Sequence, residues 1–395
     1  MVYVGNHAAH DADSHLMELP GWLRCYADPG VREHLPLLDL HGMEQVAEGA
    51  ASSTRRSEAE PAQNELFTLK NWDALGAFEP ARRSHALDLF GFRSQLVFST
   101  YSHLPLMNVP QGGGISDIEL LDGAVRAHNR GMTEFCTDDP RLLPVGWVAL
   151  DDSERAIAAA RDALDLGCAA IEIPSLPIGP KSITHVDLDR MYSMLEDAGR
   201  PLVFHVGGGG RLASPVFAED GRQRPSHQRG HAPLLPALTL MGIPAPVEMA
   251  LAALILDGVF ERHPRLMCGV IEQGATWVPG FLRRLDLAFQ EFGDSSRSGL
   301  TLRPSEYVLR QVRVTPFHYE NVRWLIDQTS ADLYMFSTDY PHDEGADQPL
   351  EWFLLHFDAQ SDGELGQFLC ANFEALMRDG LPKDLRVNRQ NASST

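Results

Sequence analysis

The stretch LPVGWVALDDSERAIAAARDALDLGCAAIEI, residues 143–173, decides the fold. It opens on a continuous apolar run, Leu143–Leu150, which is typical of a strand buried on both faces of a parallel sheet. The middle, Asp152–Leu166, has helical apolar spacing, starts with acidic and serine capping residues, and ends before Gly167. A second apolar run, Ala169–Ile173, follows at once. This unit predicts two parallel strands joined by a helix.

The same unit recurs along the chain. Besides an opening segment, Tyr3–His15, the further strand-like runs are Gln95–Ser99, Pro201–Val206, Leu266–Glu272, Val312–Phe317 and Tyr334–Asp339. Helical spacing returns in Pro246–Glu261 and Val278–Phe292. Eight strands that alternate with helices favour a (β/α)8 TIM barrel over an open doubly wound sheet. We therefore predict an α/β fold of this architecture.

Two insertions and a tail stand outside the minimal barrel. We predict one barrel domain over residues 1–382, with insertions at about residues 20–79 and 207–244, and a loose C-terminal tail over residues 383–395. Both insertions follow predicted strands, on the face where barrel active sites are built. They are expected to form lids or walls of a substrate pocket; surface loops or a subunit contact are the alternative.

Composition narrows the class of protein. The 395 residues contain 33 Lys and Arg against 54 Asp and Glu, a formal charge of −21, which disfavours binding to nucleic acid. The N-terminus lacks the pattern of a signal peptide, and the apolar run around Met249–Leu256 is too short to span a bilayer. Five widely spaced cysteines form no C-x-x-C pair. We therefore expect a cytoplasmic protein that acts on a small molecule, without a nucleic-acid or membrane partner.

Acidic and imidazole side chains stand at the ends of three predicted strands. The first strand ends on Asp11, Asp13 and His15, the fifth on His205 and the eighth on Asp339. In a barrel the carboxyl ends of all strands face one mouth, so these side chains are expected to converge. Mixed carboxylate and imidazole ligands suit a divalent metal. Alternation along a strand points Asp11, Asp13 and His15 to one side and does not choose between the two aspartates.

Further polar residues follow other predicted strands. Glu272 ends the sixth run and is a candidate acid or base, metal ligand or partner that orients His205; a salt bridge to Arg283 or Arg284 is the alternative. His318 follows the seventh strand and could reach the mouth. The candidate substrate-binding residues are His227, Arg229 and His231 on the second insertion, and His342 after Asp339. Arginine there suits a carboxylate substrate, and a solvated basic loop is the alternative.

Several segments together resemble one known family. They are the D-x-D-x-H start, NRGMTEFCTDDPRLLPVGWVAL (129–150), LVFHVGGG (202–209), IEQGATWVPGFLRRLD (271–286), FSTDYPHDEG (336–345) and a final helix with Asn372. In order and spacing they resemble the amidohydrolase-related family, which includes decarboxylases of the aminocarboxymuconate-semialdehyde and benzoate types. The resemblance runs from about residue 8 to about residue 380.

The resemblance implies a TIM barrel with a single divalent metal, zinc, with manganese as the alternative, and a homodimer. Carried over position by position, the metal ligands are Asp13, His15, His205 and Asp339, with Asp11 as the competitor of Asp13. One departure concerns the sixth strand, where family decarboxylases usually carry a histidine and this chain has Glu272.

This departure tilts the expected reaction towards hydrolysis. We expect hydrolysis of a small carboxylated or cyclic substrate by metal-activated water, with Asp339, Glu272 and His318 as catalytic residues. The alternative is a non-oxidative decarboxylase, a carbon–carbon lyase of an aromatic or muconate-like acid. A third hypothesis is a barrel scaffold without activity, which an Asp/His set in a barrel mouth disfavours because structural zinc sites prefer closed Cys/His sets.

Overall fold

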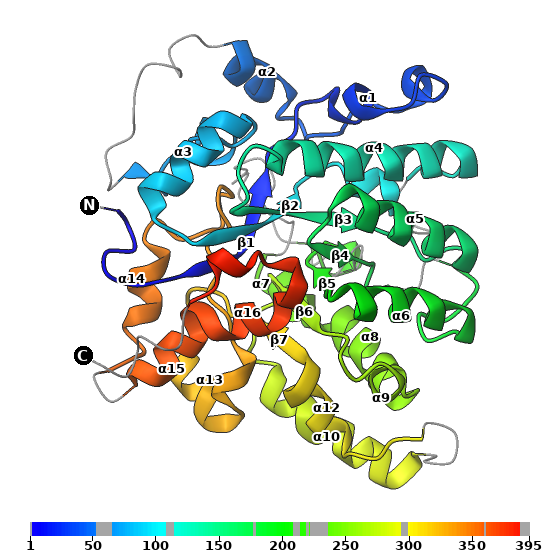
Figure 1. The fold of residues 1–395 in the computed structure, drawn as a ribbon, viewed down its shortest axis with the longest axis vertical. Helices are drawn as coiled ribbons and strands as arrows, with labels where there is room; N and C mark the ends of the chain where they lie inside the picture. The colour runs from blue at the N-terminus through cyan, green and yellow to red at the C-terminus, as the bar shows by residue number, and fades with distance from the viewer. Residues whose placement is uncertain are drawn as a thin grey trace.

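The computed structural model describes residues 2–52, 65–107, 114–176, 179–207, 214–218, 221, 236–293, 299–358 and 361–387. Seven parallel strands lie in chain order in one curled sheet (Figure 1). They are β1 (His10–Leu16), β2 (Ser94–Ser99), β3 (Leu142–Trp147), β4 (Ala170–Glu172), β5 (Leu202–His205), β6 (Cys268–Ile271) and β7 (Val312–Val314). Every strand residue is buried, as continuous apolar runs covered on both faces require.

The predicted eighth strand, Tyr334–Asp339, is not a regular strand. An isolated parallel bridge joins Tyr334 to Val314 of β7, and a second joins Tyr340 to Ser14 of β1. On the other side of β1, its pairing with β2 shifts register between Asp11 and Ser14, a bulge in β1. The segment nevertheless fills the eighth position between β7 and β1. The predicted α/β TIM-barrel class is confirmed.

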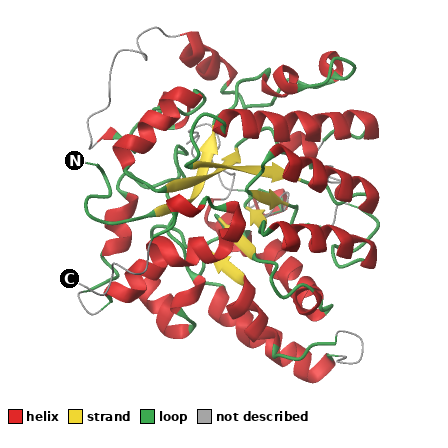
Figure 2. Ribbon diagram, in the orientation of Figure 1, coloured by secondary structure: helices red, strands yellow, loops and turns green. Residues whose placement is uncertain are grey.

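Helices surround the sheet on its outer side (Figure 2). The longer ones are α3 (Pro80–Phe90), α4 (Ile118–Cys136), α5 (Ser153–Leu166), α6 (Asp189–Ala198), α8 (Pro244–Leu256), α10 (Val278–Phe292) and α12 (Pro304–Gln311). The shorter ones are α1 (Trp22–Tyr26), α2 (Glu44–Ser52), α7 (Pro236–Gly242), α9 (Val259–Arg262), α13 (Val322–Gln328), α14 (Pro349–Leu354), α15 (Asp362–Gly366) and α16 (Asn372–Met377). Helix α5 begins and ends where the sequence predicts: Asp152 accepts hydrogen bonds from two N–H groups of its first turn, and Gly167 at φ 95° ends it.

The predicted single helix Pro246–Glu261 is wrong in its extent. The chain forms α8 and α9, separated where Gly258 adopts φ 75°, a left-handed conformation that ends a helix. The stretch Ala237–Leu256 is long and apolar enough, by length and composition alone, to cross a membrane. Its second part, α8, nevertheless packs into the protein, because Leu251 and Leu254 are completely buried in the main hydrophobic core.

The end of the chain closes the amino-terminal end of the barrel. Helix α16 lies across this opening (Figure 1), and its Phe373 stacks on His10 of β1 with ring centroids 4.9 Å apart. The first residues of the predicted loose tail also pack here: Lys383–Leu385 form a 3-10 turn, and Arg93 Nε donates to the Leu385 carbonyl at 2.5 Å. Residues 388–395 lie outside the described chain.

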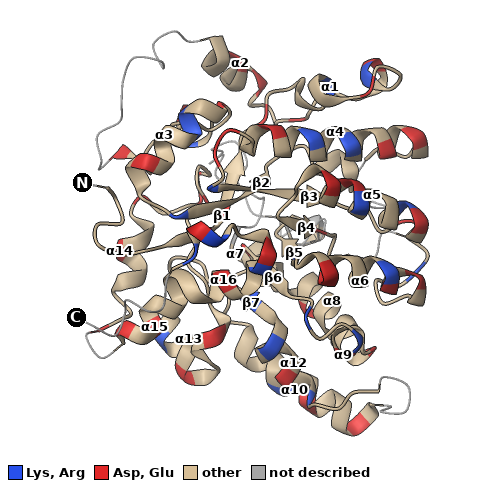
Figure 3. Cartoon of the chain, viewed as in Figure 1, with Lys and Arg blue, Asp and Glu red and all other residues tan. Residues whose placement is uncertain are grey.

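The first insertion lies beside the opposite, carboxyl-terminal opening of the barrel. Trp72 Nε1 donates to the Glu18 carbonyl at 3.1 Å, and Lys70 Nζ donates to the Gly345 carbonyl at 2.7 Å. These bonds tie the insertion to the loops that follow β1 and the eighth segment. Charged residues are concentrated on the surrounding helices, and the strands carry few (Figure 3). The carboxylates and imidazoles at the strand ends are therefore exceptions that need an explanation.

Candidate metal centre

Six side chains meet at the carboxyl-terminal mouth of the barrel. They form two overlapping groups of possible metal ligands. Each side chain offers one ligand atom, and within each group these atoms all lie within 4.8 Å of one another. The first group is Asp13, His15, His205 and Glu272, and the second is His15, Glu272, Asp339 and His342. Asp13 and His15 belong to β1, and His205 ends β5. Glu272 follows β6, Asp339 ends the eighth segment, and His342 follows that segment. Of the four predicted ligands, the structure brings Asp13, His15 and His205 together in the first group and places Asp339 in the second, which shares His15 and Glu272 with the first.

Asp11 does not belong to this cluster. Its Oδ1 accepts from the Thr338 N–H at 2.9 Å, and its Oδ2 accepts from Thr338 Oγ1 at 2.6 Å and from Gln95 Nε2 at 2.8 Å. The expectation that alternation aligns Asp11 with Asp13 and His15 is wrong. The bulge in β1 inserts an extra residue between them and breaks the alternation. Asp11 is a structural clamp between β1, β2 and the eighth segment.

Replacing Asp11 with alanine is expected to lower the free energy of unfolding by about 3 kcal/mol, because it leaves several buried donors unpaired. Urea denaturation of the metal-free protein, compared with the metal-free wild type, measures this loss. Asp13→Ala is the matched control: it removes one of several crowded carboxylates, so its loss should be much smaller. A stable Asp11→Ala protein that no longer binds metal would make Asp11 a ligand instead.

Two of the three imidazoles of the cluster, those of His15 and His205, have fixed tautomers. His15 Nδ1 lies 3.3 Å from the Ser99 carbonyl and His205 Nδ1 lies 3.0 Å from the Val206 carbonyl. A carbonyl only accepts, so each Nδ1 carries a proton and donates it. Each Nε2 then carries no proton and directs its lone pair at the cluster. This arrangement of an outer hydrogen bond and an inward nitrogen is typical of metal-binding histidines.

The inward nitrogens face carboxylate oxygens at short range. His15 Nε2 lies 3.2 Å from Asp13 Oδ1 and 3.5 Å from Asp339 Oδ1. His205 Nε2 lies 3.4 Å from Asp13 Oδ1 and 3.3 Å from Glu272 Oε2. A neutral nitrogen lone pair and a carboxylate repel each other unless a proton or a cation lies between them. A divalent cation would satisfy all of them at once.

Unpaired atoms support the same conclusion. Among the described residues, buried polar atoms without a hydrogen-bond partner include His15 Nε2 and Glu272 Oε2, both members of the cluster. Buried polar groups are rarely left unpaired, since each costs about 1–3 kcal/mol. Carboxylate oxygens and imidazole nitrogens are ligands that bind both manganese and zinc. The residues present therefore fit a divalent cation.

Asp339 and His342 form a close pair at one side of the cluster. His342 Nδ1 lies 2.8 Å from Asp339 Oδ1, Nε2 lies 2.9 Å from Thr100 Oγ1, and the ring stacks on His15 at 3.7 Å between centroids. Burial raises the pKa of Asp339 to about 7, although His342 opposes this. Burial would lower the pKa of His342, but Asp339 reverses the effect and raises it to about 9. The pair can hold a proton near neutral pH.

Glu272 takes an unusual backbone conformation. Its φ is 52° and that of Asp339 is 57°, both in the left-handed region that residues other than glycine seldom adopt. Such conformations cost about 1–3 kcal/mol each and gather at functional sites. Burial, with Asp339 and Asp13 nearby, raises the pKa of Glu272 well above its usual range. The alternative salt bridge is not observed, since Arg284 pairs with Glu248.

The remaining predicted residues have different positions. His318 lies outside the two ligand groups and lines the mouth, where burial and the charge of Lys70 lower its pKa. His342 is part of the cluster itself, as described above. The other predicted substrate-binding residues, His227, Arg229 and His231, lie outside the described residues.

Sequence reasoning missed three residues around the mouth. Glu18 is buried after β1 and accepts the N–H groups of residues 100–102 at 2.9–3.1 Å, which holds the loop after β2. His103 lies in that loop, with Nδ1 3.1 Å from Ser99 Oγ and a buried, unpaired Nε2. Its place just after the strand Gln95–Ser99 was the available signal. Nothing in the local sequence marks Lys70, the third residue.

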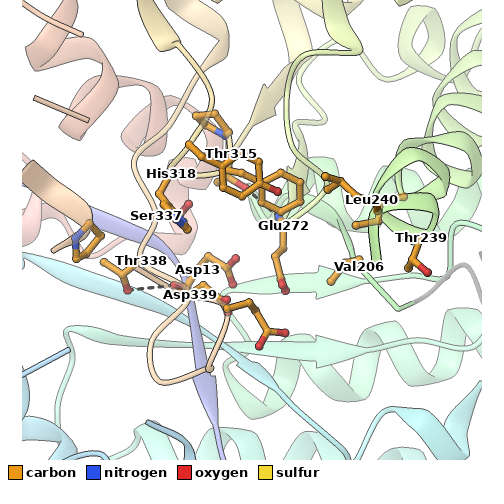
Figure 4. A pocket seen from close by; sticks show the side chains of 18 residues that line it. Asp13, Val206, Thr239, Leu240, Glu272, Thr315, His318, Ser337, Thr338 and Asp339 are labelled. Atoms are coloured by element: carbon orange, nitrogen blue, oxygen red, sulfur yellow. Dashed lines mark hydrogen bonds between the residues drawn. The ribbon is translucent and has the colours of Figure 1, made fainter. Parts of the chain in front are cut away.

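Two cavities open onto the cluster. The smaller is about 550 Å³ and is lined by Asp13, Glu272 and Asp339 on one side and by residues of α7 on the other (Figure 4). The larger is about 1140 Å³ and includes His15, His205 and His342. Glu272 and His318 line both. The cluster therefore lies where bound molecules of substantial size could reach it.

Comparison with known proteins places this geometry in a family. The sequence model of the amidohydrolase family matches residues 14–377, which contain five of the six cluster residues in full. The chain belongs to the amidohydrolase family. This membership confirms the resemblance and the expectation of an enzyme. No curated protein sequence matches the chain.

Solved structures share the fold of this amidohydrolase-family protein. An amidohydrolase from Mycobacterium avium subsp. paratuberculosis is 19% identical, with a TM-score of 0.69 over 94% of this chain and 99% of that one. A 5-carboxyvanillate decarboxylase from Novosphingobium aromaticivorans, with bound manganese, is 17% identical, with a TM-score of 0.61 over 94% and 97%. A dihydroxybenzoic acid decarboxylase from Polaromonas, also with manganese, is 15% identical, with a TM-score of 0.59 over 94% and 97%.

Proposed function

We propose that this protein is a divalent-metal-dependent decarboxylase of an aromatic carboxylic acid. The observation that carries the proposal is the set of buried, unpaired donor atoms around His15 and Glu272 at the floor of two cavities. The reaction type is supported by the fold's similarity to decarboxylases of 5-carboxyvanillate and dihydroxybenzoate.

Asp13, His15, His205 and Asp339 would hold the cation, with Glu272 beside them. We favour manganese, because two similar structures contain it and because a set rich in carboxylates suits a hard cation; zinc is the alternative. When bound, the cation neutralises the crowded carboxylates and polarises oxygen atoms of the substrate. The chain's own residues then have to orient the acid and move one proton.

Asp339 is the proposed proton donor. Its Oδ1 lies 2.8 Å from His342 Nδ1, so the two side chains can share one proton at the side of the cluster. Asp339 would give this proton to the ring carbon that bears the carboxylate. The carbon–carbon bond then breaks, its electron pair returns to the ring, and CO2 leaves. His342 would help return a proton to Asp339, and His318 would contact the acid at the mouth.

Hydrolysis, which the sequence favoured, receives less support. That preference rested on the missing histidine of the sixth strand. Glu272 occupies its place, is buried, and has a raised pKa, so it can also carry a proton as a histidine would. The replacement therefore gives no reason against decarboxylation.

The manganese-loaded protein is expected to release CO2 from one or more members of a panel of 2-hydroxybenzoic acids, without incorporating ¹⁸O from labelled water into the ring product. Chelation should abolish release, and added manganese should restore it. Gas chromatography and mass spectrometry measure both quantities. Turnover of amide, ester or lactone substrates with ¹⁸O incorporation, and no CO2, would instead establish hydrolysis. Activity that survives complete chelation would contradict the metal centre.

The homodimer, the single domain over residues 1–382 and the cytoplasmic location stay predictions. All five cysteines are free in the structure, as a reducing compartment would require.

A further inference from the structure

The two cavities that meet at the cluster differ in the chemistry of their walls. Both are lined by Val206, Glu272 and His318, so they form two lobes of one site. We call the 550 Å³ space the apolar lobe and the 1140 Å³ space the polar lobe.

The apolar lobe extends from the cluster to α7. Opposite Asp13 and Asp339, where Figure 4 labels Thr239 and Leu240, its wall consists of Ala237, Thr239 and Leu240 from α7 and of Ile243 from the turn after it. The side walls add Val206, Pro316 and Phe317. The described lining contains carboxylates only on the cluster side and near it, and no lysine or arginine.

The polar lobe has a different lining. It contains Lys70, whose pKa is lowered by burial, together with polar side chains of the first insertion and of the loop after β2. Thr68 and Asn71 come from the first insertion, Ser99 ends β2, and Thr100 and His103 follow it. Charged and hydrogen-bonding parts of a substrate fit this lobe, whereas the α7 wall of the apolar lobe offers them only Thr239.

The volume of the apolar lobe indicates the size of the substrate group that it can hold. A cavity of about 150 Å³ is enough for one benzene ring. The apolar lobe offers about 550 Å³, several times this space. An acid with a single unsubstituted ring at the cluster would leave the α7 wall uncovered. Burying apolar atoms there would strengthen binding in proportion to their area.

We propose that the natural substrate carries a bulky apolar substituent that lies against Leu240 and Ile243, while its carboxylate lies at the cluster. This inference rests on the proposed function for the position of the carboxylate. It adds the substrate class: an aromatic acid with an alkyl or aryl group opposite the carboxylate, rather than a small dihydroxybenzoate. Leu240 and Ile243 are then specificity-determining residues.

Calorimetric titration of the manganese-loaded protein tests the proposal. The probes are 2-hydroxybenzoate and its derivatives with a propyl or hexyl chain opposite the carboxylate, and, without any carboxylate, 4-propylphenol and 4-hexylphenol. Affinity is expected to rise about fourfold for each added carbon until the lobe is filled. In Leu240→Asn, which adds polarity without charge, this gain should fall at least about tenfold for the hexyl acid, while binding of 2-hydroxybenzoate changes much less.

Leu238→Asn is the matched control, because Leu238 lies on the same helix, has a similar exposed fraction (38% against 41% for Leu240) and lines neither lobe. A chain-length gain in both probe series that depends on Leu240 and not on Leu238 supports the proposal. A gain seen only with the phenols, with no binding of any acid, supports the apolar lobe and contradicts the proposed function. Affinity that is independent of chain length, or equally affected by both variants, overturns the proposal even if 2-hydroxybenzoate is decarboxylated.

Discussion

His205→Ala is expected to lose the bound cation and all measurable turnover while the barrel stays folded. His205 stands at the end of β5 with its Nδ1 committed to the Val206 carbonyl and its Nε2 directed at Asp13 and Glu272. Changes to residues that merely support a ligand already cost 10–100-fold in metal affinity, so loss of the ligand itself should cost at least about a hundredfold. It is the last residue of β5 and is not one of the side chains that form the apolar core, so its removal leaves most of the core intact.

Metal content by inductively coupled plasma mass spectrometry, CO2 release and thermal melting together test this expectation. His263→Ala is the matched control: His263 is also buried, but it contacts Asp189 and Glu196 on the outer layer. This variant should keep its metal and its turnover. Full metal stoichiometry in His205→Ala would remove His205 from the ligand set and with it the basis of the proposed function.

Asp339→Asn is expected to lower kcat by about 10²–10⁴-fold while part of the metal affinity remains. An amide keeps the size of the carboxyl group and can still contact the cation through its oxygen, but it cannot transfer a proton. The remaining donors, Asp13, His15 and His205, should retain metal at a higher manganese concentration. The large effect should therefore appear in kcat at saturating manganese.

The measurement is the rate of CO2 release at several manganese concentrations, with metal occupancy determined in parallel. Asp327→Asn serves as control, since Asp327 is exposed on α13 and pairs with Arg323. If added manganese restores full turnover to Asp339→Asn, Asp339 is a metal ligand only and another group donates the proton. Glu272 would then be the first candidate, because it is buried in the same cluster.

Local rules were sufficient for elements whose stability depends on neighbours in the chain. Helix α5 could be predicted to within a residue because its cap, Asp152, and its final glycine, Gly167, act within one turn. The strand-end position of His205 followed from an apolar run that ends at a polar residue. The extent of α8 was missed because nothing in the composition around Gly258 outweighs the apolar spacing on either side.

The choice between Asp11 and Asp13 shows where local rules stop. Both aspartates have the same spacing pattern, and alternation treats them alike. A bulge in β1, seen in its pairing with β2, separates them. Thr338, from the other end of the chain, then donates hydrogen bonds to both carboxylate oxygens of Asp11. Neither effect can be read from the residues around Asp11.

By itself, the sequence determined the alternation of strands and helices, the barrel class, and the positions of Asp13, His15, His205 and Asp339 at strand ends, because burial periodicity and capping act over a few residues. Only the tertiary structure decided which carboxylates are left unpaired, how Glu272 and His342 join the cluster, and that α7 faces it across an apolar lobe. These features depend on hydrogen bonds and contacts between residues hundreds of positions apart, which become neighbours only when the barrel closes.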